Sequence, residues 1–142
     1  AGRLGDEPVG IHREAEQLYL RALAIFQKTY GREHYEVAIN LNNLAANCHA
    51  QGRDEEAERL YRRAFAIKAK LLGAQHPDLA VTANNLAALF KSQQKYKAAM
   101  PLYRYALDIF EKALGAEHPK VAICRGNYAK LLDELRLRKP QR

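Results

Sequence analysis

The chain has 142 residues, a length that ordinarily forms one domain, and 48% of them are hydrophobic, enough to build a continuous core. The formal net charge is +7, which favours acidic partners. Ser92 is the only serine, so a serine hydrolase has a single candidate nucleophile, and no apolar run approaches the roughly 20 residues that span a bilayer.

The N-terminal part divides into a polar segment and a first helix. Residues 1–12 lack the apolar stretch of a signal peptide, and we expect them to be disordered or left over from the expression vector. Residues 13–34 are predicted to hold a helix with Leu18, Ala22 and Ile25 on one face. This helix has no preceding partner helix in the chain, so we expect part of its apolar face to be uncovered.

From residue 13 onward the chain repeats with a period of 42 residues. Glycines 31, 73 and 115 follow this period. So do several other sets of three, namely His34, His76 and His118; Tyr19, Tyr61 and Tyr103; Ile25, Ile67 and Ile109; and Asn43, Asn85 and Asn127. Self-similarity at a fixed period of this length is typical of a helical repeat array.

Each repeat is predicted to hold two helices. In the first complete repeat, residues 35–76, one helix spans 35–50 and a second spans 54–72, separated by a break at Gly52 that suits a left-handed C-terminal cap. A second complete repeat follows at residues 77–118, and residues 119–135 form one more first helix before a basic tail at 136–142. The sequence therefore predicts about six helices, out of phase with whole repeats at both ends.

The wording of the repeat resembles a known family. Leu41-x-x-Leu44-Ala45-x-x-Cys48, followed by Ala57, Tyr61 and Ala64, is similar to the tetratricopeptide repeat. The 42-residue period and the Gly73-x-x-His76-Pro77 connector resemble the kinesin-light-chain type of this repeat across residues 13–135. The resemblance implies an all-α, right-handed solenoid of stacked antiparallel helix pairs that serves as a non-catalytic adaptor or scaffold for protein binding.

The first helices of such repeats line a concave wall, where one asparagine recurs in every unit: Asn43, Asn85 and Asn127. A carboxamide offers two donor hydrogens and an acceptor, so it can pair with the N–H and C=O groups of a peptide backbone. The resemblance implies the same role, because the matching tetratricopeptide position contacts peptide main chain. The alternative is that these amides hydrogen-bond a neighbouring helix or loop within the chain.

The adjacent positions complete a predicted peptide-binding groove. The further residues proposed for it are Asn42, Asn84, Ala46, Ala88, His49, Lys91 and Lys130. Ala46 and Ala88 leave room for a ligand side chain, and His49 and Lys91 favour an acidic one. The same face carries Val81 and Ile123. The kinesin-light-chain resemblance also implies acidic, aromatic-containing peptides, although Asp133 and Glu134 would repel them in the last unit.

Other functions receive less support from the sequence. Histidines in successive repeats are about 10 Å or more apart, too far to share a zinc ion, so we predict that they hydrogen-bond the connectors. We expect no nucleic-acid binding, because Tyr61 belongs to the core stripe and Arg59, Arg62 and Arg63 are predicted to form a solvated face. We expect no membrane span, cofactor, metal or enzyme activity.

Two further expectations concern the cell and the assembly. Cys48 and Cys124 are predicted to be buried free thiols, which suits the cytoplasm. The uncovered apolar residues at the first helix suggest either that the chain belongs to a longer protein or that it forms a homo-oligomer. A purely structural array, which spaces other domains or self-associates, is thus the main alternative to a peptide-binding module.

Overall fold

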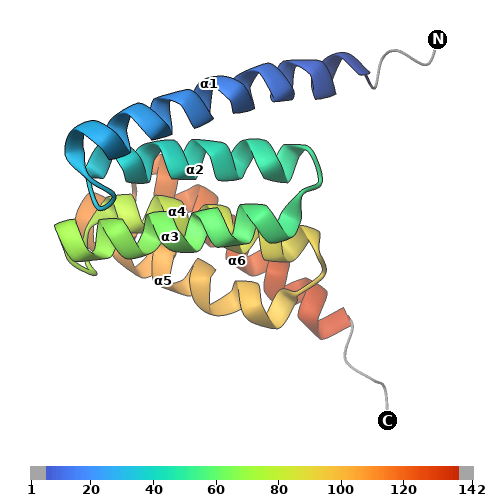
Figure 1. The fold of residues 1–142 in the computed structure, drawn as a ribbon. Helices are drawn as coiled ribbons and strands as arrows, with labels where there is room; N and C mark the ends of the chain where they lie inside the picture. Colours follow the sequence, from blue (N-terminus) through green and yellow to red (C-terminus); the bar gives the residue numbers. More distant parts are fainter. Residues whose placement is uncertain (1–5, 138–142) are drawn as a thin grey trace. The chain divides into compact units, whose positions relative to one another are not determined.

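The computed structural model describes residues 6–137, with side chains from residue 10 onward. Within this range it has six α-helices and no strand, as predicted (Figure 1). The helices are α1 (Asp6–Tyr30), α2 (Tyr35–Ala50), α3 (Asp54–Leu72), α4 (Pro77–Ser92), α5 (Tyr96–Leu114) and α6 (Pro119–Leu137). They fall into two compact units, residues 1–71 and 72–142, which we describe separately.

The predicted bounds of the helices hold in the middle of the chain and differ at its ends. Helix α1 begins at Asp6, so residues 6–12 are helical rather than disordered. Pro8 falls in the first turn of α1, where its missing N–H removes no intrahelical hydrogen bond. Helix α6 continues to Leu137, beyond the predicted end at 135. The remaining predictions for the termini concern residues 1–5 and 138–142 and lie outside the described residues.

Unit 1 has one apolar core shared by its three helices. Val37, Ala38 and Leu41 of α2 are fully buried against Ala64 and Ile67 of α3. Leu23 and Phe26 of α1 and Leu60 of α3, which are partly buried, pack on this cluster. Small side chains at Ala38 and Ala64 permit the close approach of the helices.

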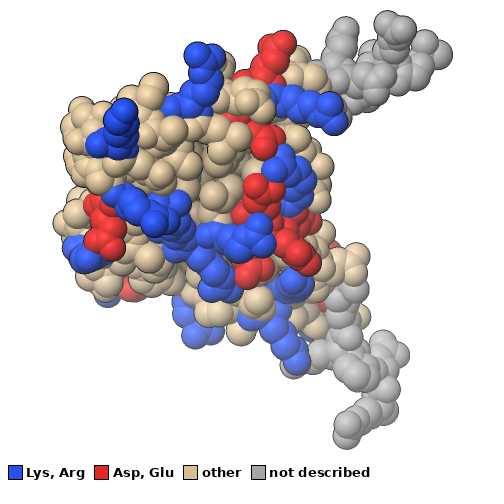
Figure 2. All heavy atoms as spheres, in the orientation of Figure 1, with Lys and Arg blue, Asp and Glu red and all other residues tan. Residues whose placement is uncertain are grey.

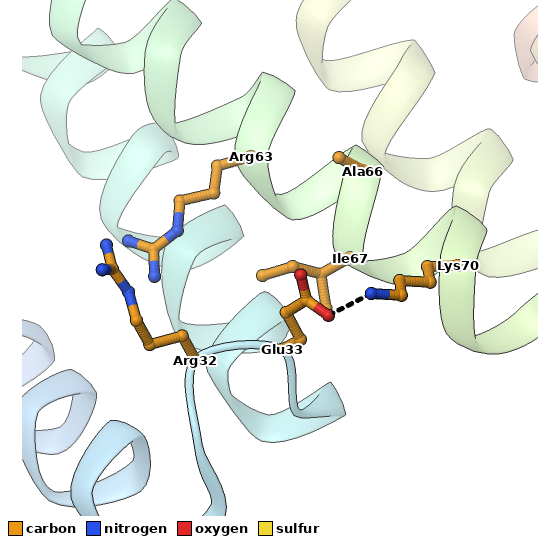
Figure 3. A pocket seen from close by; sticks show the side chains of 6 residues that line it. All are labelled: Arg32, Glu33, Arg63, Ala66, Ile67 and Lys70. Carbon is orange, nitrogen blue, oxygen red and sulfur yellow. Dashed lines mark hydrogen bonds and ion pairs between the residues drawn. The ribbon is translucent and has the colours of Figure 1, made fainter.

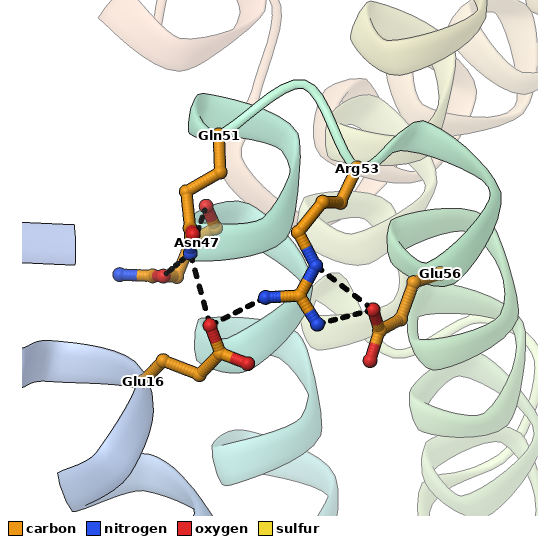
Figure 4. Close-up of polar contacts among 5 residues, drawn as sticks. All are labelled: Glu16, Asn47, Gln51, Arg53 and Glu56. Atoms are coloured by element: carbon orange, nitrogen blue, oxygen red, sulfur yellow. Dashed lines mark hydrogen bonds and ion pairs between the residues drawn. The ribbon is translucent and has the colours of Figure 1, made fainter. Parts of the chain in front are cut away.

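A polar network ties the three helices of unit 1 together at the end where α2 turns into α3 (Figure 4). The Arg53 guanidinium donates to Glu16 of α1 and to Glu56 of α3, and the Gln51 amide donates to Glu16 at 3.1 Å and to Asn47 Oδ1 at 2.6 Å. Figure 2 shows acidic and basic side chains beside one another on the face drawn. The bond from Arg53 keeps the pKa of the Glu16 carboxyl below its usual value.

Helices α2 and α4, the first helices of the two complete repeats, end in the same way. After α2, Gly52 adopts φ +78°, its N–H donates to His49 O, and the Arg53 N–H donates to Cys48 O. These bonds make a Schellman motif with glycine at the left-handed position, as the sequence predicted. After α4, Gln94 takes that position with φ +61° and its N–H donates to Lys91 O. A glutamine there pays a steric penalty that glycine avoids.

Unit 2 packs α5 against both α4 and α6. Tyr103, Ala106 and Ile109 of α5 are buried, as are Leu86 of α4 and Leu131 of α6. Pro101 lies inside α5, which continues through it from Tyr96 to Leu114.

Candidate functional site

A cavity of about 230 Å³ opens on unit 2 between its two first helices, α4 and α6. Its lining residues are Val81, Asn84 and Asn85 of α4, Phe110 of α5, and Lys120, Ile123 and Cys124 of α6. Positions 84 and 85 follow position 81 by one turn on a single face of α4. Positions 123 and 124 follow position 120 in the same way on α6. The helical periodicity thus brings two matched faces together over the buried ring of Phe110.

The cavity combines apolar walls with a few polar groups. Val81 and Ile123 are 37% and 61% exposed, so their side chains are accessible to a ligand. Lys120 is exposed and supplies a positive charge in the first turn of α6. Burial raises the pKa of the Cys124 thiol, so this residue lines the cavity as a neutral group, with Sγ 4.0 Å from Asn84 Oδ1. Sites for peptides and small molecules commonly have this composition.

Five asparagines of the first helices divide into two classes. Asn40 and Asn47 are buried, and both side chains are used within α2: Asn40 Nδ2 donates to Glu36 O at 3.0 Å, and Asn47 Oδ1 accepts from Gln51. The repeated residues Asn43, Asn85 and Asn127 are instead half-buried, and their amides make no hydrogen bond with any described residue. An amide that the fold does not use is available to a ligand.

The predicted site residues lie on accessible faces of the first helices. Asn42, Asn43 and His49 are half-buried on α2, and Ala46 is exposed there. The matching positions of α4 behave alike: Asn84, Asn85 and Lys91 are half-buried, and Ala88 is exposed. On α6, Asn127 is half-buried and Lys130 is exposed. Of this set, Asn84 and Asn85 line the cavity.

Sequence reasoning missed Lys120, Phe110 and Cys124 as lining residues. Lys120 precedes the asparagine position by a full seven residues, at the start of α6 where no binding residue was sought. Phe110 and Cys124 have the sequence pattern of core residues and are indeed buried, but one edge of each reaches the cavity. Lys120 lies four residues before Cys124, which places both on the same face of the helix. This spacing was the signal in the sequence that could have identified Lys120.

The repeated histidines cap the helices that follow them, whereas the sequence predicted hydrogen bonds to the connectors. Nδ1 of His34, His76 and His118 accepts a hydrogen bond from the backbone N–H two residues later, at 3.1 Å in each case. Each thereby satisfies one of the N–H groups left without a partner at a helix start. The recurrence of histidine is therefore explained by capping of α2, α4 and α6.

The prediction for the arginines of α3 is right for two and wrong for one. Arg59 and Arg62 are exposed, and Arg62 pairs with Glu58 at 3.0 Å. Arg63 is half-buried, because it turns toward the connector before α2 instead of toward solvent. Tyr61 is 2% exposed, and burial raises the pKa of its hydroxyl to about 12. Its ring is therefore a core element and does not offer a surface for base stacking.

Comparison with known proteins identifies the family to which the chain belongs. The family model of the tetratricopeptide repeat matches residues 10–70, 55–112 and 78–139, so the chain belongs to the tetratricopeptide repeat family. Members of this family are helical scaffolds for protein interaction. No curated protein matches the chain. Within residues 6–137, no helix is long and apolar enough to cross a membrane.

Solved structures narrow the type of repeat. The chain is similar to nearly identical TPR-like repeats assigned to a kinesin light chain of Podosopora anserina, with 29% identity and a TM-score of 0.78 over 86% of this chain. It is also similar to BtubC (BKLC) from P. vanneervenii, with 28% identity and a TM-score of 0.81 over 93% of this chain. It spans 58% and 51% of those two chains. The resemblance to kinesin-light-chain repeats is thus confirmed.

Proposed function

We propose that the chain is a non-catalytic adaptor and that unit 2 binds an extended segment of a partner protein in the cavity between α4 and α6. The observation that carries the proposal is the Asn85 amide, which lines this cavity and which no described residue hydrogen-bonds. A carboxamide in this state can pair with one N–H and one C=O of a peptide backbone without losing any bond of the fold.

The neighbouring side chains define the peptide that the cavity would accept. Val81, Ile123 and the edge of Phe110 offer an apolar surface for one aliphatic or aromatic side chain. Lys120 at the rim offers a charge to a carboxylate next to it in the peptide. The first helices are held by their cores and histidine caps, so binding requires little ordering of the protein. The proposed ligand is therefore an acidic segment with one large apolar side chain.

Some of the positions used on α4 recur on α2 of unit 1. Asn43 on α2 has the exposure of Asn85, and Ala46 leaves an open position one turn later, as Ala88 does on α4. His49 stands where α4 has Lys91. We propose that unit 1 offers a second site of the same kind, with a weaker charge at the histidine position. On α6, Asn127 and Lys130 are the corresponding groups of the last repeat.

The experiment is a peptide-array screen followed by affinity measurements on Asn84→Ala/Asn85→Ala. We expect the double variant to bind the selected peptide at least fivefold more weakly than the wild type, with the melting temperature nearly unchanged. The matched control is Asn40→Ala, which removes an asparagine of α2 that is already bonded within the chain. It should lower the melting temperature and leave peptide affinity in unit 2 unchanged.

Two results would reject the proposal. Peptide affinity that is equal in the wild type and the double variant would remove the amides from recognition. A large fall in melting temperature for the double variant would assign them a structural role instead. Lys120→Glu tests the proposed preference for acidic peptides separately. We expect this variant to select basic instead of acidic peptides on the array.

Self-association is the second candidate, and the surface of α1 favours it. Ile11, Leu18 and Ile25 are 65%, 63% and 61% exposed and recur every seven residues, so they form one apolar stripe. A second copy could cover this stripe. Analytical ultracentrifugation of the wild type and of Leu18→Lys/Ile25→Lys tests this self-association. A wild-type protein that sediments as a monomer, like the variant, would exclude the homo-oligomer.

Two remaining assignments follow from general chemistry. Cys48 and Cys124 are unpaired and buried, which suits a reducing compartment, and we propose that the protein acts in the cytoplasm. We also propose that the chain has no catalytic activity of its own. Supporting this, the residues that line the cavity between α4 and α6 include no carboxylate.

A further inference from the structure

A second cavity, of about 470 Å³, lies in unit 1 between the connector from α1 to α2 and the outer face of α3. Its lining residues are Arg32, Glu33, Arg63, Ala66, Ile67 and Lys70. This set shares no residue with the cavity of unit 2, and the function proposed above does not use it. Figure 3 shows the guanidinium groups of Arg32 and Arg63 pointing toward one another across it.

Like charges that face each other are unfavourable unless something negative lies between them. The Arg63 Nη2 atom is buried and has no hydrogen-bond partner in the described structure. Burial, together with the positive charge of Arg32, lowers the pKa of Arg63 from its usual value. A buried charged donor without a partner is costly, so the site is incomplete as it stands.

The other charged groups of the cavity leave its balance positive. Lys70 Nζ pairs with Glu33 Oε2, so this lysine and this carboxylate largely cancel (Figure 3). The two arginines remain, with a combined charge of about +2 at neutral pH. A monovalent carboxylate would neutralise half of this charge, whereas a phosphate monoester carries about −1.5 to −2 charges near neutral pH and can neutralise nearly all of it.

We propose that Arg32 and Arg63 form a binding site for a phosphomonoester group. Guanidinium forks bind phosphate oxygens through paired N–H donors, so two of them can engage the three terminal oxygens of one phosphate. Ala66 and Ile67 supply an apolar wall beside the arginines for the carbon atoms to which the phosphate is attached. The phosphate can belong to a free small molecule or to a phosphorylated side chain of a partner, and both offer the same chemistry.

The whole chain provides the test. Inorganic phosphate and a phosphoserine peptide are titrated into the protein and followed by ³¹P NMR and by the melting temperature, since a ligand that binds the folded state raises it. We expect both probes to raise the melting temperature of the wild type. We expect Arg63→Ala and Arg32→Ala to weaken phosphoserine binding at least tenfold. Arg59→Ala, an exposed arginine of the same helix outside the cavity, is the matched control and should change it less than twofold.

Three further readouts distinguish a built site from general attraction of anions to a basic protein. Glu33→Gln should tighten phosphate binding, because it removes the only carboxylate of the cavity. Arg32→Ala should melt no lower than the wild type without ligand, since the variant loses a repulsion. Binding should strengthen between pH 5.5 and 7.5 as the phosphate loses its second proton, at a pKa of about 6.

The outcomes are decisive in both directions. Equal losses in Arg59→Ala and Arg63→Ala, or no stabilisation of the wild type by either probe, would overturn the site. Phosphoserine peptides that bind at least tenfold more tightly than inorganic phosphate, and lose this advantage in Arg63→Ala, identify a partner side chain as the source. Equal affinity for the two identifies a free phosphate. Each result is independent of the peptide cavity of unit 2, which contains neither arginine.

Discussion

The connector before α2 in unit 1 and the connector before α4 in unit 2 occupy the same place in the repeat but carry different side chains. In unit 1, Arg32 faces Arg63 of α3. In unit 2, the residues 42 positions later are Ala74 and Tyr105, and the Tyr105 hydroxyl donates to the Ala74 carbonyl oxygen. The connector of unit 2 is thus held to its helix by a hydrogen bond. In unit 1, the Arg63 Nη2 atom beside the connector is buried and has no hydrogen-bond partner in the described structure.

This difference distinguishes the positions that the fold of each repeat requires from the positions that the fold does not constrain. The fold requires an apolar face, a helix cap and a chain reversal in each repeat, and both units meet these needs with equivalent residues. Positions that face a connector or an inner wall are not constrained in this way. Ligand sites are therefore to be sought where equivalent positions differ, or where a polar residue recurs without an internal partner. The following five predictions test this division.

The largest effect should come from the isoleucine at the shared core position. Ile67 and Ile109 are 5% and 1% exposed, whereas Ile25 at the same position of α1 is 61% exposed. We expect Ile67→Ala and Ile109→Ala each to lower the free energy of unfolding by roughly 2–4 kcal/mol, because each leaves a cavity in a packed core. Ile25→Ala should cost less than about 0.5 kcal/mol. Urea unfolding monitored by circular dichroism measures all three, and a large loss for Ile25→Ala would show that α1 is covered in solution.

The next effect concerns the polar network that only unit 1 carries. Arg53→Ala should cost about 1–2 kcal/mol, the range for charged hydrogen bonds reduced for the 38% exposure of this side chain. Lys95→Ala, at the matching position of unit 2, should cost almost nothing. Equal losses in the two variants would contradict the assignment of the network to unit 1.

The network also sets a pH dependence. The bond from Arg53 lowers the folded-state pKa of Glu16, so this carboxylate stabilises the fold above its unfolded pKa of about 4.3. The stabilisation is lost as pH falls through the lowered folded-state pKa. The difference in stability between the wild type and Glu16→Gln should therefore be constant from pH 6 to 8 and shrink below about pH 4. A difference that grew on acidification would contradict this account.

A smaller effect is expected at the turns after the first helices. Gly52 and Gln94 share a left-handed conformation, which glycine adopts without steric cost. Gln94→Gly should stabilise unit 2 by about 0.5–1 kcal/mol, and Gly52→Gln should destabilise unit 1 by about 1 kcal/mol. Thermal unfolding of the two variants checks both signs. Destabilisation by Gln94→Gly would mean that the glutamine side chain has a role we have not assigned.

The smallest effect belongs to the histidine caps. His76→Ala and His118→Ala should each cost about 0.5 kcal/mol, because one N–H per helix loses its acceptor, and His76→Asn should restore most of the loss. His34→Ala should cost somewhat more, since its ring also stacks on Tyr30 with centroids 4.3 Å apart. Chemical unfolding of the four variants compares them. Equal costs at His34 and His76 would show that the stacking adds nothing.

Much of the fold could be predicted from the sequence, because its determinants are local and repeated. The bounds of α2 and α3, the left-handed Gly52 and the capping histidines all follow from patterns within a few residues. The early start of α1 was missed because residues 1–12 carry little apolar pattern, although a proline in the first turn costs no hydrogen bond and the helix begins at Asp6.

The sites were harder to predict, because they bring together residues distant in the sequence. The asparagine position was found from its recurrence, but the recurrence alone could not tell a bonded amide from an unbonded one. The pair of Arg32 and Arg63 was missed because the two residues belong to different elements and approach only when the connector folds back on α3. The available signal was that both residues change in the next repeat, where Ala74 and Tyr105 stand 42 positions after Arg32 and Arg63.

The central claim is that the recurring amides are free in the fold and engaged by a ligand. Side-chain amide signals in a ¹⁵N–¹H NMR spectrum test it most directly, recorded while a peptide selected on the array is added. We predict that the Asn85 signals shift with the peptide and that those of Asn40 and Asn47, which are bonded within α2, remain in place. Asn85 signals that stay unchanged at saturating peptide would contradict the claim.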